Sequence, residues 1–139
     1  MITKNFESTI EYAKEFAKKL KGGEVIGLIG DLGCGKTTFV KGLAEELRVN
    51  EGITSPTFVI LKKYHGKIKD KKIDFVHIDA YRAESIDDIK SVGIEDYLAA
   101  DNVVMVIEWA ERIKEILPEN TIYIKFKHIS ENTREIVEL

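Results

Sequence analysis

Glycine, lysine and threonine residues between positions 30 and 37 have the spacing of a phosphate-binding loop. The pattern G-x-x-x-x-G-K-[ST] is met by Gly30, Gly35, Lys36 and Thr37. Gly33 adds a third position without a Cβ, and such positions let backbone N–H groups turn toward phosphate oxygens. The lysine supplies a charge for the β- and γ-phosphates, and the threonine hydroxyl can ligate Mg²⁺. The stretch therefore predicts a nucleotide-phosphate site.

The whole loop is expected to contact the nucleotide. The predicted contacts come from Gly30, Asp31, Leu32, Gly33, Cys34, Gly35, Lys36, Thr37 and Thr38. Cys34 is the one cysteine of the sequence, which excludes a disulfide within the chain and is typical of a reducing compartment. A helix N-terminus beside a lysine can activate a thiol. The loop needs only a small side chain at position 34, so we interpret Cys34 as a small loop residue and not as a redox-active thiol.

Two carboxylates follow apolar runs, where the strands of an α/β sheet are expected to end. Asp79 follows residues 75–78, and Glu108 follows residues 103–107. A phosphate-loop NTPase needs such a carboxylate to hold Mg²⁺ or its waters, and ligands bind beyond the carboxyl ends of the strands. The uninterrupted apolar run favours Glu108 for the position beside the loop. Each could instead be a helix cap or a surface acid, and Asp79 could bind metal or orient water.

Three further polar residues have open roles. Thr54 and Thr57 could ligate Mg²⁺ or touch the γ-phosphate, as a switch loop does, or could belong to a plain turn around Pro56. His77 lies inside a predicted strand, where a histidine is more often structural than catalytic.

The elements that must position these residues alternate between strands and helices. Residues 25–29 form an apolar run before the loop, and apolar residues follow it at helical spacing: Phe39, Val40, Leu43 and Leu47. The continuous run 103–107 is typical of a central parallel strand covered on both faces. We therefore predict an α/β fold of the P-loop NTPase type, with a mostly parallel central sheet and helices on both faces.

Antiparallel hairpins are predicted at the sheet edges. Residues 59–64 and 73–79 form one, with a long loop around 66–71, and 121–129 pairs with 133–139 in a closing hairpin. Shorter helical segments are expected over 85–90, 94–100 and 110–117. An N-terminal helix is predicted from an N-cap at Ser8 to about Leu20, with Glu11 completing a capping box.

Length and composition describe one ordinary globular domain spanning residues 1–139. Hydrophobic residues make up 44% and charged residues 32% of the chain. The net charge of −3 argues against a broad nucleic-acid footprint, and the basic run 67–72 is predicted to be a solvated hairpin tip. No apolar stretch approaches the roughly 20 residues of a membrane span, and the first residues lack a signal-peptide pattern. A cytoplasmic protein without a membrane partner is expected.

Three classes of phosphate-loop protein can be compared with these features. A GTPase should carry an Asn-Lys-x-Asp signature, which is absent, and Arg82 stands where its glycine would follow Asp79. A small-molecule kinase usually has an arginine-bearing lid, and this chain has four arginines and little room for one. A small ATPase that acts on partner proteins needs neither feature. We favour the ATPase and keep the kinase as the alternative.

The ordered set of motifs resembles the TsaE family, the ATPase component of the bacterial machinery for threonylcarbamoyl-adenosine modification of tRNA. The resemblance covers nearly the whole chain and rests on residues 30–39, 55–58, 77–82, 93–97 and 108–109. It implies ATP and Mg²⁺ as cofactors and TsaB- and TsaD-like proteins as partners, with tRNA reached only through the complex.

The resemblance also implies roles for single residues. Thr37 and Glu108 would be metal ligands and Asp79 would lie at the triphosphate, so that Lys36, Asp79 and Glu108 form the predicted catalytic set. Thr9 and Arg134 would contact the nucleotide. Cys34 departs from the alanine usual in the family, and Thr133 stands where glycine is frequent.

Overall fold

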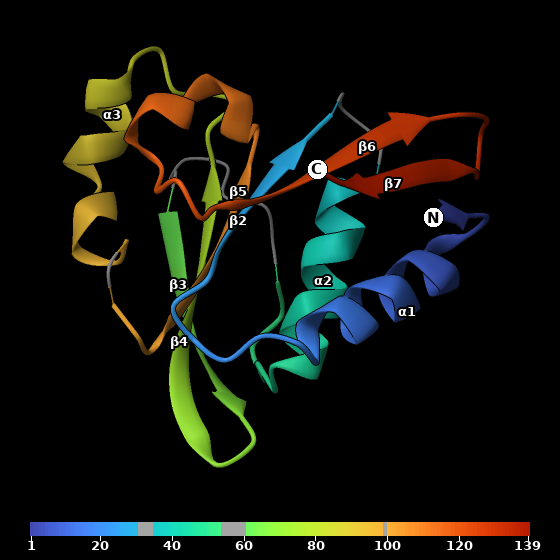
Figure 1. Ribbon diagram of the computed structural model, residues 1–139, viewed down its shortest axis with the longest axis horizontal. Helices are drawn as coiled ribbons and strands as arrows, with labels where there is room; N and C mark the ends of the chain where they lie inside the picture. The colour runs from blue at the N-terminus through green and yellow to red at the C-terminus, as the bar shows by residue number, and fades with distance from the viewer. Residues whose placement is uncertain (31–34, 54–60, 99) are drawn as a thin grey trace.

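A seven-stranded mixed sheet forms the centre of the computed structural model, which describes residues 1–30, 35–53, 61–98 and 100–139 (Figure 1). The strand order is β1-β7-β6-β2-β5-β4-β3. The strands are β1 (Ile2–Thr3), β2 (Val25–Ile29), β3 (Leu61–Ile68), β4 (Lys71–Asp79), β5 (Val103–Glu108), β6 (Ile122–His128) and β7 (Arg134–Glu138). The α/β class is confirmed.

The middle of the sheet is parallel and its edges are antiparallel. Strand β2 pairs in parallel with β5 and β6, and β5 pairs in parallel with β4. The hairpins β3–β4 and β6–β7, and the short pair β1–β7, are antiparallel. The predicted edge hairpins are confirmed, whereas "mostly parallel" overstates a described sheet in which three of six pairings are antiparallel. The two-residue strand β1 was missed because it is too short for a sequence pattern.

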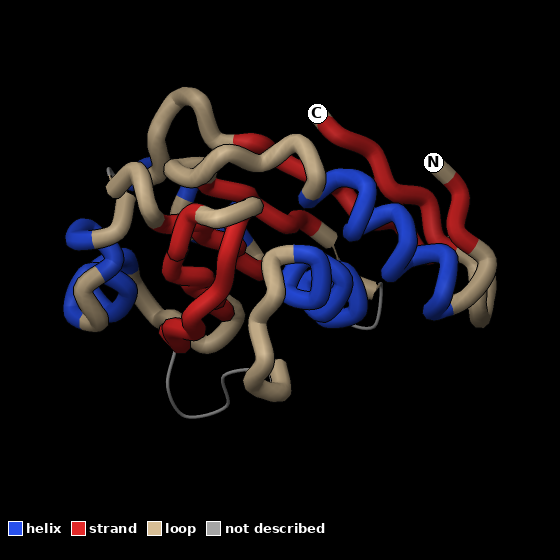
Figure 2. Tube along the Cα trace, turned by 90° about the horizontal axis from the view of Figure 1, so that it is seen from below, coloured by secondary structure: helices blue, strands red, loops and turns tan. Residues whose placement is uncertain are grey.

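Helices cover both faces of the sheet. Helices α1 (Phe6–Ala17) and α2 (Lys36–Glu46) pack on one face, and α3 (Ile86–Ser91) with several 3-10 turns packs on the other (Figures 1 and 2). Strand β5 contributes to both layers, because Val104 and Val106 face α2 while Met105 and Ile107 face α3. The prediction of a central strand covered on both faces is confirmed.

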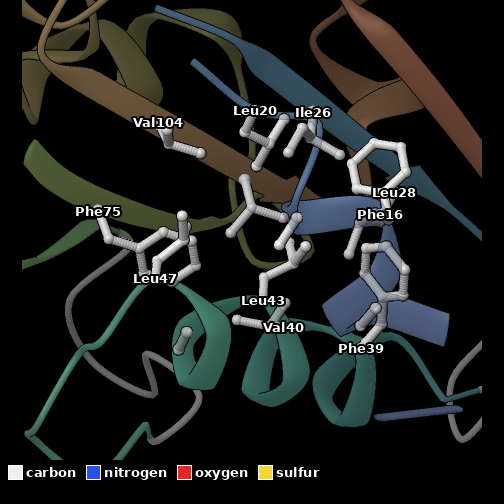
Figure 3. Close-up of a cluster of buried hydrophobic side chains, with 14 of the residues drawn as sticks. Phe16, Leu20, Ile26, Leu28, Phe39, Val40, Leu43, Leu47, Phe75 and Val104 are labelled. Carbon is white, nitrogen blue, oxygen red and sulfur yellow. The ribbon is translucent and has the colours of Figure 1, made fainter. Parts of the chain in front are cut away.

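Aromatic and branched side chains fill the layer between the sheet and α1–α2 (Figure 3). Phe39 lies at its centre, with its ring centroid 5.8 Å from that of Phe16 and 5.4 Å from that of Phe126. Both Ile26 and Leu28 of β2 are fully buried in this layer. The core therefore holds the end of β2 and the start of α2 in fixed relation, and these two elements flank the predicted phosphate loop.

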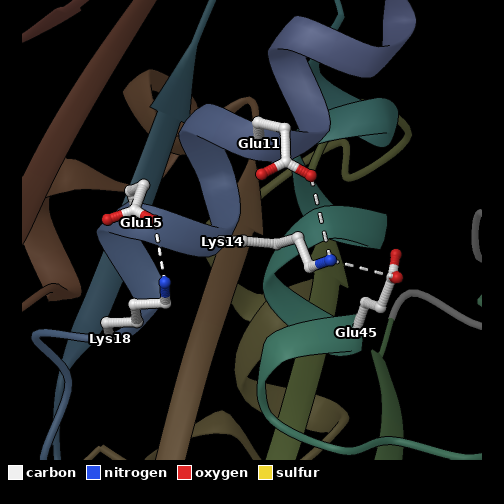
Figure 4. A network of polar contacts seen from close by, with 5 residues as sticks. All are labelled: Glu11, Lys14, Glu15, Lys18 and Glu45. Carbon is white, nitrogen blue, oxygen red and sulfur yellow. Dashed lines mark hydrogen bonds and ion pairs between the residues drawn. The ribbon is translucent and has the colours of Figure 1, made fainter.

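Close contact between α1 and α2 depends on a glycine. A Cβ at Gly42 would lie 2.6 Å from the Cβ of Ala13, so the helices approach where neither has a larger side chain. At the rim, Lys14 of α1 lies 3.3 Å from Glu45 of α2 and 3.9 Å from Glu11 (Figure 4). Exposed ion pairs of this kind contribute little to stability, so the apolar contact determines the packing.

Helix α1 begins earlier than predicted. Asn5 is the N-cap, and its Oδ1 accepts a 2.8 Å hydrogen bond from the backbone N–H of Ser8. The Ser8 hydroxyl accepts in return from the backbone N–H of Asn5 at 3.2 Å. Ser8 is therefore the third residue of the helix and not its cap, because serine serves equally well as the reciprocal partner in a capping box.

The β3–β4 hairpin is longer and tighter than predicted. Residues 66–68 continue the strand, and a two-residue turn at Lys69 and Asp70 replaces the expected long loop. The cause is a contact with the end of α2: Lys67 N–H donates to the carbonyl of Leu47 at 2.7 Å, and that oxygen lies 2.6 Å from where a Cβ at Gly66 would be. The glycine permits the approach that extends the strand.

Two segments expected to be α-helical are 3-10 turns. Residues 94–96 form one after Gly93, and 110–117 contains two, Ala110–Arg112 and Lys114–Ile116. The predicted short helix with its N-cap at Ser85 is confirmed as α3. No helix in the part of the chain described here has the length and apolar character needed to cross a membrane.

Candidate nucleotide site

Glycines with positive φ stand at both ends of the predicted phosphate loop. Gly30 follows β2 with φ of +147°, and Gly35 caps α2 with φ of +97°. Such angles favour residues without a Cβ. The four residues between them, Asp31, Leu32, Gly33 and Cys34, lie outside the described chain, so their contacts to the nucleotide stay predictions. The segment with Thr54 and Thr57 also lies outside it.

The Lys36 side chain reaches back to Gly30, where the predicted loop begins. Lys36 is only 4% exposed, and its Nζ donates a 2.5 Å hydrogen bond to the carbonyl of Gly30. The same Nζ lies 3.7 Å from the centre of the Trp109 ring, within the range of a cation–π interaction. The positive charge is therefore held between Gly30, which follows β2, and Trp109, which follows β5.

Glu108 connects the end of β5 to the start of α2. Its Oε1 accepts a 3.3 Å hydrogen bond from the hydroxyl of Thr37, and its Oε2 lies 2.7 Å from Nε2 of His77. Only 4% of Glu108 is exposed. A threonine hydroxyl and a carboxylate oxygen are thus placed together next to the predicted phosphate loop.

Asp79 lies next to Glu108 on the neighbouring strand. The two residues are paired in the parallel register of β4 and β5, and strand alternation places both side chains on the α2 face. The Asp79 Oδ1 accepts a 2.9 Å hydrogen bond from Tyr81 N–H. Burial raises the pKa of Asp79 above its ordinary value, and the charge of Glu108 raises it further, against that backbone hydrogen bond.

The donor set suits a hard cation bound together with phosphate. The described residues contain no group of three histidine, cysteine or acidic side chains that could cage a metal ion by themselves. Mg²⁺ commonly takes one or two protein oxygens and completes its octahedron with phosphate oxygens and waters. The Thr37 hydroxyl and Glu108 Oε1, which lie 3.3 Å apart, fit that requirement, and Asp79 is paired with Glu108 on the next strand.

Thr9 and Arg134 are connected through Thr3 of β1. Thr9 is buried, and its hydroxyl donates to Thr3 Oγ1 at 2.9 Å. Thr3 is paired with Arg134 across β1 and β7. The Arg134 side chain reaches toward the loop, because a Cβ at Gly35 would lie 3.8 Å from its Cγ. Arg134 thus lies beside Gly35 at the end of the predicted loop, whereas the hydroxyl of Thr9 contacts Thr3.

Aromatic and basic side chains form a cluster on the other side of Lys36. The rings of Tyr81 and Trp109 lie 4.9 Å apart, and the Arg112 guanidinium lies 5.4 Å from the first and 5.9 Å from the second. Tyr81 is 39% exposed. Tyr81 and Trp109 lie within two of the motif segments that carry the family resemblance, 77–82 and 108–109, whereas no motif marks Arg112.

His77 has a contact that sequence reasoning missed. A structural role is expected for this histidine and stays a prediction, and the imidazole lies 2.7 Å from the Glu108 carboxylate. The signal available was its position two residues before Asp79, since residues i and i+2 of a strand share a face.

Comparisons with known proteins agree along the whole chain. The family model described as "Threonylcarbamoyl adenosine biosynthesis protein TsaE" matches residues 3–136. The tRNA threonylcarbamoyladenosine biosynthesis protein TsaE of Treponema pallidum is 37% identical over 97% of this chain and 96% of that protein. Its namesake in Bacillus subtilis is 41% identical over 96% of this chain and 80% of that protein.

A solved structure gives the same result. The crystal structure of Bacillus subtilis YdiB superposes with a TM-score of 0.76 at 38% identity, covering 99% of this chain and 82% of that one. The fold, the ordered motifs and the comparisons agree. The chain belongs to the TsaE family.

Proposed function

We propose that this protein binds and hydrolyses ATP with Mg²⁺, and that this activity serves threonylcarbamoyl modification of adenosine in tRNA. The observation that carries the proposal is the 3.3 Å hydrogen bond between Thr37 and Glu108, next to a lysine whose amino group reaches the Gly30 carbonyl. Family membership supports the link to tRNA, because the relatives are named for that biosynthesis.

Each residue has a distinct part in this proposal. Lys36 leaves the Gly30 carbonyl and binds phosphate oxygens, where a point charge offsets their negative charge. The Thr37 hydroxyl and the Glu108 carboxylate hold Mg²⁺, which when bound neutralises phosphate charge. Asp79 either orients the attacking water or joins the metal shell. Arg134 and the glycine-rich loop hold the nucleotide from the opposite side.

Partners complete the site in this proposal. Among the described residues Arg112 is directed at aromatic rings, and Arg134 donates to the carbonyls of Ser130, Glu131 and Thr133. An arginine supplied in trans can raise turnover by roughly 10³- to 10⁵-fold. We propose that TsaB- and TsaD-like proteins dock at the face bearing Tyr81 and Trp109, in the cytosol, and that tRNA is reached through them.

The test is ATP hydrolysis by the purified chain, alone and with TsaB- and TsaD-like proteins of the same organism. We expect slow turnover that rises with the partners and is lost in Lys36→Ala. The exposed Lys41 of the same helix offers a control, since Lys41→Ala should hydrolyse ATP normally. ADP formation that needs a small metabolite and ignores the partners would identify a kinase and refute the proposal.

A further inference from the structure

His77 is fully buried beside the nucleotide site. It lies on β4, two residues before Asp79 and on the same face as Phe75, in the layer under α2. Its Nε2 lies 2.7 Å from Oε2 of Glu108, whose side chain is 6% exposed. A carboxylate oxygen accepts, so Nε2 is the donor in this hydrogen bond.

The His77 imidazole and the Thr37 hydroxyl contact different oxygens of the Glu108 carboxylate. Oε2 is held by His77, and Oε1 is left facing the Thr37 hydroxyl at 3.3 Å. A carboxylate on a glutamate side chain can rotate about its last torsion, which has broad preferences. The hydrogen bond from a rigid, buried ring removes that freedom, and it fixes which oxygen points toward the loop.

A packing role alone does not account for His77. Its Nδ1 is buried and has no hydrogen-bond partner among the residues that the structure describes. Buried polar atoms are nearly always paired, and an apolar side chain of similar size would fill this space without an unpaired nitrogen. Local features that weaken folding are expected where function requires them.

We propose that His77 is a positioning residue: it holds Glu108 so that Oε1 and the Thr37 hydroxyl are preset as a pair of Mg²⁺ ligands. This inference rests on the proposed function and extends it to a residue that touches neither metal nor nucleotide. Groups that orient metal ligands typically change metal affinity by 10- to 100-fold when removed. The effect of His77 is therefore predicted on the Mg²⁺ dependence of ATP binding.

The experiment compares three variants by calorimetric titration of ATP at a series of Mg²⁺ concentrations. His77→Gln keeps a donor at about the reach of Nε2, His77→Asn keeps polarity with too short a reach, and His77→Leu has no donor. We expect the half-saturating Mg²⁺ concentration to rise roughly 10- to 100-fold for Asn and Leu and to stay within about threefold for Gln. Binding in EDTA should be equal in all folded variants.

The exposed histidine of the same hairpin is the control. His65 is 78% exposed and pairs with Asp74 far from the loop, so His65→Leu should leave the Mg²⁺ dependence unchanged. Thermal unfolding establishes which variants fold. If His77→Leu does not fold, the comparison of His77→Gln with His77→Asn is sufficient. Equal Mg²⁺ dependence in folded Gln and Asn variants overturns the inference.

Glu108→Gln separates the two proposals. If this variant loses Mg²⁺-dependent binding while the His77 variants keep it, the inference about His77 fails and the metal site stands. If wild-type protein shows no Mg²⁺-dependent ATP binding, the proposed function fails and the inference fails with it.

Discussion

The amino group of Lys36 lies 3.7 Å from the centre of the Trp109 ring, and the backbone of Trp109 is left-handed with φ of +59°. A bulky residue adopts that angle only where its surroundings enforce it. The left-handed backbone directs the indole toward Lys36 directly after Glu108. The ring thus holds the lysine cation in place, and a phosphate bound at the predicted site would have to compete with the ring for it.

Trp109 should therefore report nucleotide binding by its fluorescence. It is the one tryptophan of the sequence, so the emission has a single source. When the lysine moves from the ring to the phosphates, the indole loses a charge at 3.7 Å, and its emission should shift in position or intensity. Titration with ATP and Mg²⁺ measures the change. A constant emission during binding verified by calorimetry would show that the lysine does not leave the ring.

Glu108 and Asp79 should differ in what their loss removes. Because Glu108 bonds Thr37, Glu108→Ala should weaken Mg²⁺-dependent ATP binding more than Asp79→Ala. If Asp79 orients water, its loss should reduce turnover by about 10²- to 10⁴-fold while ATP still binds. Binding and single-turnover measurements at several Mg²⁺ concentrations distinguish these outcomes. Equal and small effects of both substitutions would place neither carboxylate in the site.

Asp79 should also make stability depend on pH. Burial is the main cause that raises its pKa above 3.8 in the folded state, so folding favours the protonated acid. Its contribution to stability is fully present below the unfolded-state pKa and is lost as the pH rises through the folded-state value. Asp79→Asn keeps an oxygen for Tyr81 N–H but has no charge to bury. The variant should be more stable than wild type at neutral pH.

Urea unfolding of both proteins between pH 3 and pH 8 tests this sign. The stability advantage of Asp79→Asn should shrink as the pH falls toward 3.8 and below, where the wild-type carboxyl is protonated in both states. An advantage that is constant over this range would show that the charge is not responsible.

Gly42→Ala should destabilise the contact between α1 and α2. In an exposed helix this change would be stabilising, because alanine has the higher helix propensity. Here the new Cβ would lie 2.6 Å from the Cβ of Ala13 and 2.9 Å from the Ile10 carbonyl oxygen. Overpacking of this kind costs about 1–3 kcal/mol of unfolding free energy. Gly52→Ala, outside the helices, is a control for the added methyl group, since no described atom lies within 4 Å of its Cβ position and the change should be within about 0.5 kcal/mol.

Sequence patterns predicted the parts of this fold that depend on local periodicity. The apolar run 103–107 indicated a strand buried on both faces, and β5 is that strand. The alternation of apolar and polar residues predicted the β6–β7 hairpin, and the capping preference of serine predicted Ser85 as the N-cap of α3. The features that were predicted wrongly depend on contacts between segments that are distant in the sequence. The length of β3 depends on a hydrogen bond to Leu47, and no local pattern near Gly66 encodes that partner.

The candidate site likewise contains residues that a local pattern marks and residues whose role depends on contacts between distant segments. Lys36, Thr37, Asp79 and Glu108 could be singled out because a motif or a strand end marks each of them. The roles of His77 and Arg112 depend on which strand lies beside which, and on where a left-handed residue directs the chain after β5. Strand order is a property of the folded sheet. It was therefore out of reach of reasoning that reads residues one segment at a time.

Strand β1 brings the two ends of the polypeptide together: the Met1 amino group donates to the Ile136 carbonyl at 3.1 Å, and Ile136 N–H donates back at 2.8 Å (Figure 1). A short linker from Leu139 to Met1 would make the chain continuous there. New ends could then be opened between Lys69 and Asp70, at the far end of β4 and about 26 Å along that strand from Asp79. Such a circular permutant keeps every strand beside its present neighbours. Thr37, Glu108 and His77 would meet as before, because their meeting depends on adjacency in the sheet and not on the order in which the segments are synthesised.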